Sequence, residues 1–76
     1  MSIPVINLRE TGANIKRLRK QNNIPVSSLC DVFGFSTPQA IYKWERGACL
    51  PTIDNLIILA RLFNSHVEDV LIINDV

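Results

Sequence analysis

Residues 36–47 constrain the fold of this chain most, because their spacing predicts a short helix with two chemically opposite faces. Ala40, Ile41 and Trp44 fall at i, i+1 and i+4, which places three apolar side chains on one side of an α-helix. The opposite side is rich in hydrogen-bond donors and carries Gln39, Tyr42, Lys43 and Arg46. We therefore expect one face of this helix to pack in a core and the other to meet a polar partner.

Signals at both ends set the length of this helix, which we predict at residues 37–46. The hydroxyl of Thr37, or of Ser36 before it, can cap the free backbone N–H groups, and Pro38 fits the first turn. Gly47 can adopt the left-handed conformation that ends a helix. A helix of about three turns with donors on its outer face suits the major groove of DNA.

A second short helix is predicted just before it, at residues 26–33, where Leu29, Val32 and Phe33 are apolar at i, i+3 and i+4. Residues 34–36 link the two helices, and Gly34 makes a tight turn possible there. Two helices joined by a short turn that contains glycine are the signature of a helix-turn-helix motif.

Short motifs in a specific order run through most of the chain. They are Ile15-Lys16-Arg17-Leu18-Arg19, Leu29, Gly34, Ile41-Tyr42-Lys43-Trp44-Glu45-Arg46-Gly47 and Leu50-Pro51-Thr52-Ile53-Asp54-Asn55-Leu56. On these motifs, residues 8–72 resemble the lambda-repressor-like family, in particular the Cro/repressor (XRE) type of bacterial and phage regulators. Two features depart from the family's pattern. Val26 stands where the family often has a phosphate-holding glutamine, and the turn from Gly34 to Ile41 is one residue longer.

Caps and apolar stripes predict three further helices. They cover residues 8–21, 53–63 and 66–72. Asn7 and Glu10 form a capping pair for the first of these helices, and Thr52 can cap the second. His66 lies in the cap region of the third. The expected inward stripes are Leu8, Thr11, Ile15 and Leu18 in the first helix and Leu56, Leu59, Ala60 and Phe63 in the second.

The chain of 76 residues is expected to form one domain, and no sustained period-2 run occurs before its last residues. We therefore predict an all-α fold over residues 1–76, a compact five-helix bundle with a helix-turn-helix motif. Its apolar runs are too short to cross a bilayer and it has no secretory signal, which indicates a soluble, cytoplasmic protein of bacterial or phage origin. Cys30, Cys49 and His66 lack the spacing of a metal site, so we expect no metal and no cofactor.

The charges are distributed unevenly along the chain, although the net charge is only +1. Residues 1–46 hold seven basic and three acidic residues, a net charge of +4, whereas residues 47–76 hold one basic and four acidic residues, a net charge of −3. Such asymmetry predicts a basic surface on the first three helices that can face phosphates, and an acidic end that faces away from them.

The leading hypothesis is a sequence-specific transcriptional regulator, most simply a repressor, that binds a double-stranded DNA operator as a homodimer. Its residue 37–46 helix would lie in the major groove of each half-site, with half-site centres roughly 34–36 Å apart. The candidate base contacts are Thr37, Gln39, Tyr42 and Lys43. The candidate phosphate contacts are Arg17, Lys20, Ser27, Ser28 and Arg46. The resemblance further implies a structural ion pair between Arg19 and Glu45.

A protein-interaction module, such as an antitoxin-like or adaptor domain, is the alternative. It rests on apolar residues of the residue 53–63 helix that exceed the needs of one buried face: Ile53, Ile57, Ile58 and Leu62. These side chains can meet the last helix or another subunit. An enzyme is not expected, because one histidine, no glycine-rich phosphate loop and no clustered carboxylates leave nothing to assemble a reaction centre.

Overall fold

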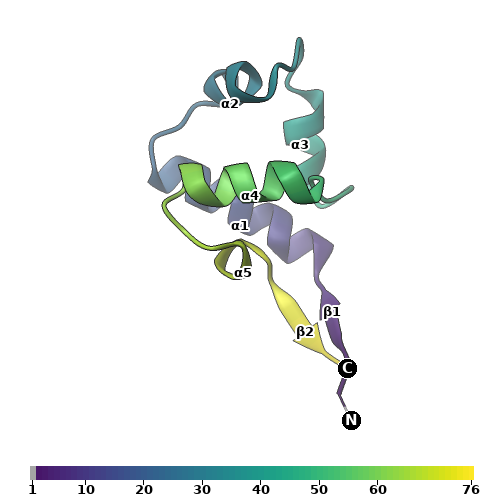
Figure 1. Ribbon diagram of the computed structural model, residues 1–76. Coiled ribbons are helices and arrows are strands. Elements are labelled where there is room, and N and C mark those ends of the chain that lie inside the picture. The colour runs from purple at the N-terminus through teal and green to yellow at the C-terminus, as the bar shows by residue number, and fades with distance from the viewer. Residues whose placement is uncertain (1) are drawn as a thin grey trace.

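The computed structural model describes residues 2–76, which form five helices and two short strands (Figure 1). In chain order the elements are β1 Pro4–Ile6, α1 Leu8–Gln21, α2 Val26–Phe33, α3 Gln39–Glu45, α4 Ile53–Leu62, α5 Val67–Val70 and β2 Ile73–Asp75. The predicted five-helix bundle is confirmed. The strands, which the sequence did not predict, add a small two-stranded sheet to it.

One apolar core joins the helices, and α1 contributes to it from the middle of the bundle, where it contacts both α3 and α5. The buried apolar side chains are Ile15, Leu18, Leu29, Ile41, Trp44, Leu56, Leu59, Ala60, Phe63 and Val70. The predicted stripe of α4 is therefore buried. Complete burial of one large apolar side chain stabilises a fold by about 1.5–3 kcal/mol, so these residues carry most of the stability of the helical body.

Two glycines allow α3 to end directly against α1. A Cβ atom on Gly12 would clash with the carbonyl oxygens of Trp44 and Glu45. Gly47 has the predicted left-handed conformation, with φ +77°, and a Cβ atom there would lie 2.7 Å from the Cα atom of Arg9. The separation of α1 and α3 is therefore set by backbone contact rather than by side chains.

Local caps start α1 and α4 where the sequence predicts. The Asn7 side chain accepts a hydrogen bond from the Glu10 N–H at 2.9 Å. The reciprocal half of the capping pair is absent, because the Asn7 N–H donates to the carbonyl of Ile72 instead, at 2.8 Å. The Thr52 hydroxyl accepts from the Asn55 N–H at 3.3 Å and caps α4.

The start of α3 differs from the prediction. It begins at Gln39 rather than at Thr37, and no side chain caps it. Pro38 occupies the cap position, and its carbonyl accepts the first helical hydrogen bond, from the Tyr42 N–H at 3.1 Å. The longer link thus places Thr37 and Ser36 before the helix, and the expectation that one of them caps it was wrong. At their other ends, α3 and α4 stop one residue earlier than predicted.

The last helix is shorter than predicted, because the chain turns into a strand after it. Leu71 is extended, with ψ 132°, so α5 ends at Val70. His66 is the N-cap residue of α5, as predicted, and its N–H donates to the Asp69 carboxylate at 3.0 Å.

Leu8 is a further correction: it was expected in the inward stripe of α1, but it is 42% exposed where α1 meets the strands.

The two strands pair at the ends of the described chain and form what we call the terminal ribbon, β1 with β2. The pairing is antiparallel, with Pro4 opposite Asp75 and Ile6 opposite Ile73. Figure 1 shows the ribbon leaving the helical body at the end opposite α2.

Candidate nucleic-acid interface

An aromatic cluster holds α2 and α3 together beneath their link. Gly34 ends α2 in the left-handed conformation, with φ +71°, and the Phe35 N–H then donates to the carbonyl of Cys30 at 2.9 Å. The rings of Phe33 and Phe35 lie edge-on to the indole of Trp44, with centroids 5.5 Å and 5.8 Å away. Edge-on aromatic pairs favour a defined geometry. The cluster therefore fixes how α3 is presented relative to α2.

The two predicted faces of α3 are separated in the structure. On the inner face, Ile41 is fully buried and Trp44 is 5% exposed, while Ala40 is half-buried. The side chains on the outer face are all exposed: Gln39, Tyr42, Lys43 and Arg46. The outer face can donate and accept hydrogen bonds without any change in the core.

A buried ion pair attaches α3 to α1. The Arg19 guanidinium meets the Glu45 carboxylate through Nε at 2.6 Å and through a second nitrogen at 3.3 Å. Arg19 also donates to the carbonyl of Ile24 at 3.2 Å. The side chains of the pair are only 10% and 6% exposed, so the charges compensate each other largely out of water. This is the pair that the family resemblance implied, and it orients α3 through its last turn.

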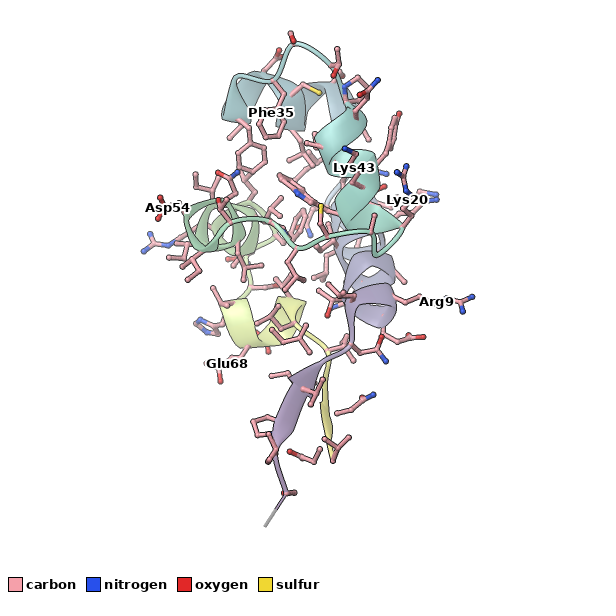
Figure 2. All side chains as sticks on the ribbon, turned by 90° about the vertical axis from the view of Figure 1, so that its right-hand side faces the viewer. Arg9, Lys20, Phe35, Lys43, Asp54 and Glu68 are labelled. Carbon is pink, nitrogen blue, oxygen red and sulfur yellow. The ribbon has the colours of Figure 1, made fainter. Side chains whose placement is uncertain are left out.

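One side of α1 carries a basic stripe formed by Arg9, Lys16 and Lys20. These residues are spaced at i, i+7 and i+11 and are all exposed. In Figure 2, Arg9, Lys20 and Lys43 lie on the side of the molecule away from Asp54 and Glu68. The predicted separation of basic and acidic surfaces is therefore present.

Lys16 is a further candidate for the interface, one that the sequence analysis did not place among the phosphate contacts. It lines a shallow hollow together with Tyr42, Glu45 and Arg46 from the end of α3. Because the Glu45 carboxylate is already paired with Arg19, Lys16 and Arg46 leave two cationic groups at this hollow. Helical periodicity could have found Lys16, since it is seven residues after Arg9 and four before Lys20 on one face.

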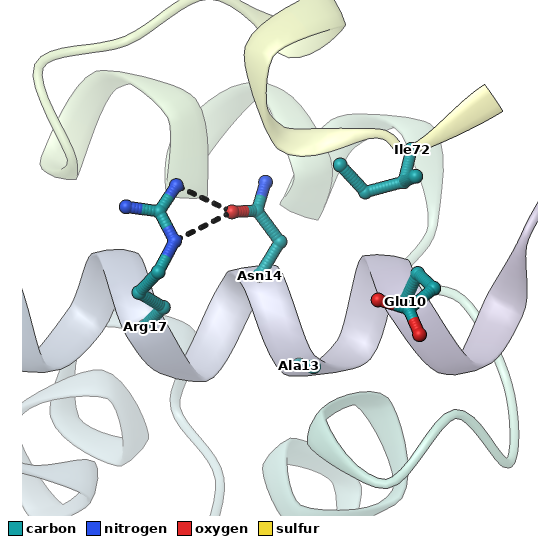
Figure 3. Close-up of a pocket in the computed structure, with 5 residues that line it drawn as sticks. All are labelled: Glu10, Ala13, Asn14, Arg17 and Ile72. Carbon is teal, nitrogen blue, oxygen red and sulfur yellow. Dashed lines mark hydrogen bonds between the residues drawn. The ribbon is translucent and has the colours of Figure 1, made fainter.

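Arg17, a predicted phosphate contact, is directed elsewhere. Figure 3 shows it on the side of α1 that faces α5 and β2. It donates to the side-chain oxygen of Asn14 at 3.1 Å and 2.7 Å, and to the Gln21 side chain at 3.2 Å. Asn14 in turn donates to the carbonyls of Asp69 and Val70, at 2.9 Å and 3.0 Å. Arg17 therefore supports the contact between α1 and α5 and does not join the basic stripe.

The remaining candidates lie near the start of α2 and in the link. Ser27 is exposed and Ser28 is half-buried in the first turn of α2, where no side chain caps the helix. Thr37 is exposed in the link, directly before the Pro38 cap. Of these three hydroxyl residues, Ser27 lines a groove between α2 and the link, together with Cys30, Asp31, Phe35, Ser36 and Tyr42, among others.

The thiols and other titratable groups form no metal site in the described part of the chain. No group of three potential ligands is found within residues 2–76. Cys30 is half-buried in α2, as expected of a packing residue, whereas Cys49 is exposed. Over the same residues, no helix has the length and apolar character that crossing a membrane requires.

Comparison with known proteins gives two matches. A family model described as helix-turn-helix matches residues 15–70. Among solved structures, the DNA-binding domain of BldD from S. venezulae has the same fold, with a TM-score of 0.69 at 20% sequence identity, covering 86% of this chain and 96% of that one. No curated protein matches the sequence.

Proposed function

The chain belongs to the XRE-type helix-turn-helix family, and from that premise we propose that it is a sequence-specific transcriptional regulator that reads double-stranded DNA with α3. The observation that carries the proposal is the division of α3 into two faces. Ile41 and Trp44 hold the helix in the core, and its outer face presents only polar and basic groups together with one tyrosine. We place this outer face in the major groove, where base edges offer donors and acceptors.

Chemistry divides the contacts between bases and phosphates. Gln39 can form two hydrogen bonds with adenine, and Lys43 can donate to the acceptors of guanine. Tyr42 can contact the methyl group of thymine or the backbone, and Thr37 lies in the link, two residues before α3 begins. These four residues are the proposed base contacts.

Phosphate contacts would fix the register of α3 on the duplex without reading sequence. We assign them to Lys20, Arg46, Ser27, Ser28 and Lys16. The hollow shared by Lys16, Tyr42 and Arg46 supports the addition of Lys16. Arg17 is the earlier candidate that this arrangement supports least, because its guanidinium is bound to Asn14 and Gln21.

The regulator would bind as a homodimer in the cytoplasm and repress by occupying its operator. A recognition helix as short as α3, from Gln39 to Glu45, touches only a few base pairs, so two copies are needed for a useful site. The operator is then pseudo-palindromic, with half-site centres one helical turn, roughly 34–36 Å, or a multiple of it apart.

Selection of bound sites from random duplex DNA tests this proposal. The purified chain should enrich one motif in two inverted copies at fixed spacing. Enrichment that is no greater than for a variant with Gln39→Ala and Lys43→Ala would contradict it. Selected sites with a single unpaired motif would contradict the dimer alone.

A protein-interaction module is a second candidate, because α4 exposes apolar side chains. Ile53 is 76% exposed, and Ile57 and Ile58 are 44% and 37% exposed. The outer face of α3, which carries no Leu, Ile or Phe, does not extend this surface. The two functions can coexist in one chain. A pull-down of protein partners tests the second function, with an Ile57→Asp variant as the control that disrupts the apolar face of α4 and leaves α3 unchanged.

A further inference from the structure

The terminal ribbon has an unusual concentration of uncovered apolar side chains. Within residues 2–76, eleven large apolar residues are exposed, and six of them lie on the ribbon or at its base: Ile3, Val5, Ile6, Leu8, Ile73 and Val76. Every residue of β1 and β2 is exposed. Because side chains alternate along a strand and opposite residues share a face, Ile6 and Ile73 lie on one face, and Ile3 and Val76 on the other.

The helical part of the fold does little to stabilise this ribbon. An isolated two-stranded ribbon is marginally stable in water and needs further strands or a packing partner. Within residues 2–76, the helical body supplies neither, since both strands are exposed along their whole length.

The two edges of the ribbon are not equivalent. Ile3 and Val76 exchange two backbone hydrogen bonds, at 2.7 Å and 2.9 Å, so the alternating antiparallel pattern points the backbone groups of the next pair, Pro4 and Asp75, outward. Proline has no N–H, which leaves the outer edge of β1 without a donor at that position. On β2, the outward groups of Ile73 and Asp75 form a complete set of donors and acceptors.

We propose that β2 pairs with β2 of a second copy of this chain and forms a closed, two-fold dimer. Antiparallel pairing centred on Asn74 places Ile73 of one copy opposite Asp75 of the other and joins the strands through four backbone hydrogen bonds. The result is a four-stranded sheet in the order β1-β2-β2-β1. The Pro4 edge lies at both outer margins, so a third copy cannot add in the same way.

Three observations favour a second copy as the partner. The partner must itself offer a strand edge with free backbone donors and acceptors and with apolar side chains beside it. The β2 strand of every copy offers such an edge. In the centred register the two Asp75 carboxylates do not face each other, so like charges are not opposed across the pair. The ribbon also lies at the end of the molecule opposite α2, so pairing there takes place away from α2 and from the link that joins it to α3 (Figure 1).

The exposed face of α4 is the competing surface, and it is less suited to this role. Asp54 and Arg61 interrupt its isoleucines, and its backbone groups are satisfied within the helix. It offers no open edge. The proposal requires no DNA, so it can fail while the proposed function stands, and the reverse is also possible.

Sedimentation equilibrium without DNA, over a series from micromolar to millimolar chain, is the first test. The wild-type chain should dimerise. Asp75→Pro removes the outward donor of β2 and should weaken the dimer at least tenfold, whereas Asp75→Ala, which keeps that donor, should dimerise like the wild type. A wild-type chain that stays monomeric at every concentration overturns the proposal, as does equal dimerisation of Asp75→Pro and Asp75→Ala.

A cysteine cross-link provides a second test that does not depend on the proline. At the centre of the proposed pairing the two Asn74 residues form a non-hydrogen-bonded pair with Cα atoms about 4.5 Å apart, within reach of a disulfide. In a Cys30→Ala, Cys49→Ala background, Asn74→Cys should yield covalent dimer on mild oxidation, and Glu68→Cys on α5 should not. Equal cross-linking of the two variants would overturn the proposal. So would loss of the dimer in Ile57→Asp together with its retention in Asp75→Pro.

Discussion

Two regions of the molecule join segments that are far apart in the sequence: the α1–α3 contact and the terminal ribbon. The interactions that form them differ. At the α1–α3 contact, backbone touches backbone at Gly12, and the charges of Arg19 and Glu45 are almost wholly buried. In the ribbon, apolar side chains are in water and the strand edges are open. The α1–α3 contact therefore fixes the position of one helix against the other. The ribbon keeps backbone groups and apolar side chains that have no partner within the described chain.

This difference matches the separate roles that we propose for the two regions. A helix that reads bases must be held rigidly, because base contacts tolerate little displacement, and the α1–α3 contact would meet that requirement. An association surface must stay accessible in the single chain. Mutations at the α1–α3 contact should therefore change folding, and mutations in the ribbon should change assembly with little effect on folding.

The largest effect on stability is expected for Glu45→Ala. It leaves the Arg19 guanidinium buried without its counter-charge, which should lower the free energy of unfolding by about 3–5 kcal/mol. Urea denaturation followed by circular dichroism measures it. Glu68→Ala, which removes an exposed carboxylate from α5, is the matched control and should change stability by less than about 0.5 kcal/mol.

A double-mutant cycle then isolates the pair itself. Arg19→Ala and Glu45→Ala together should cost clearly less than the sum of the single changes, with a coupling free energy above the roughly 0.2–1 kcal/mol of exposed pairs. If the losses of the two single variants simply add up in the double variant, the ion pair does not help to hold α3 against α1.

At the same contact, Gly12→Ala should have a smaller effect than Glu45→Ala, a loss of about 1–3 kcal/mol from overpacking against the carbonyls of Trp44 and Glu45. The sign of the change is informative. At an open helical position the same substitution raises stability by up to about 1 kcal/mol, because alanine favours the helix. Thermal denaturation of Gly12→Ala and of the wild-type chain measures the sign of the change. Ala13→Ser, at the exposed neighbouring position, is the control. A stabilised Gly12→Ala would show that α1 and α3 do not touch there.

The smallest effect on folding is expected in the ribbon. Ile73→Ser should change the free energy of unfolding by less than about 0.5 kcal/mol in dilute, monomeric solution, because Ile73 is 47% exposed. Ile41→Ala, a change of the same residue type in the core, should cost about 2–5 kcal/mol. Similar losses for the two variants would place the ribbon within the folding core and abolish the distinction between the regions.

The helical body was predictable because its signals are local. Asn7 starts α1, Gly34 ends α2, and the spacing of Ile41 and Trp44 defines the inner face of α3. The start of α3 was missed because Pro38 took the cap position from Thr37. The Arg19–Glu45 pair came from the family resemblance, since two residues 26 positions apart give no periodic signal.

The ribbon could not be predicted in the same way. Its strands have three residues each and pair across nearly the whole chain, from Pro4 to Asp75. Neither strand is long enough to show a period-2 pattern, and no hairpin turn connects them. The direction of Arg17 was missed for a related reason, because Asn14 acquires its partners Asp69 and Val70 only in the folded chain.

In the proposed complex, the outer face of α3 reads bases, while Lys16 and Lys20 of the basic stripe only hold phosphates. Binding of Gln39→Ala, Lys43→Ala, Lys16→Ala and Lys20→Ala to operator and to scrambled duplex, over a salt series, tests it most directly. Gln39→Ala and Lys43→Ala should keep the wild-type fold and each lose about 1–3 kcal/mol of discrimination at one position per half-site. Lys16→Ala and Lys20→Ala should weaken both duplexes alike and lower the salt slope by about one unit each. If Gln39→Ala and Lys43→Ala instead keep the wild-type ratio of specific to non-specific affinity, α3 is not the reading element and the central claim is wrong.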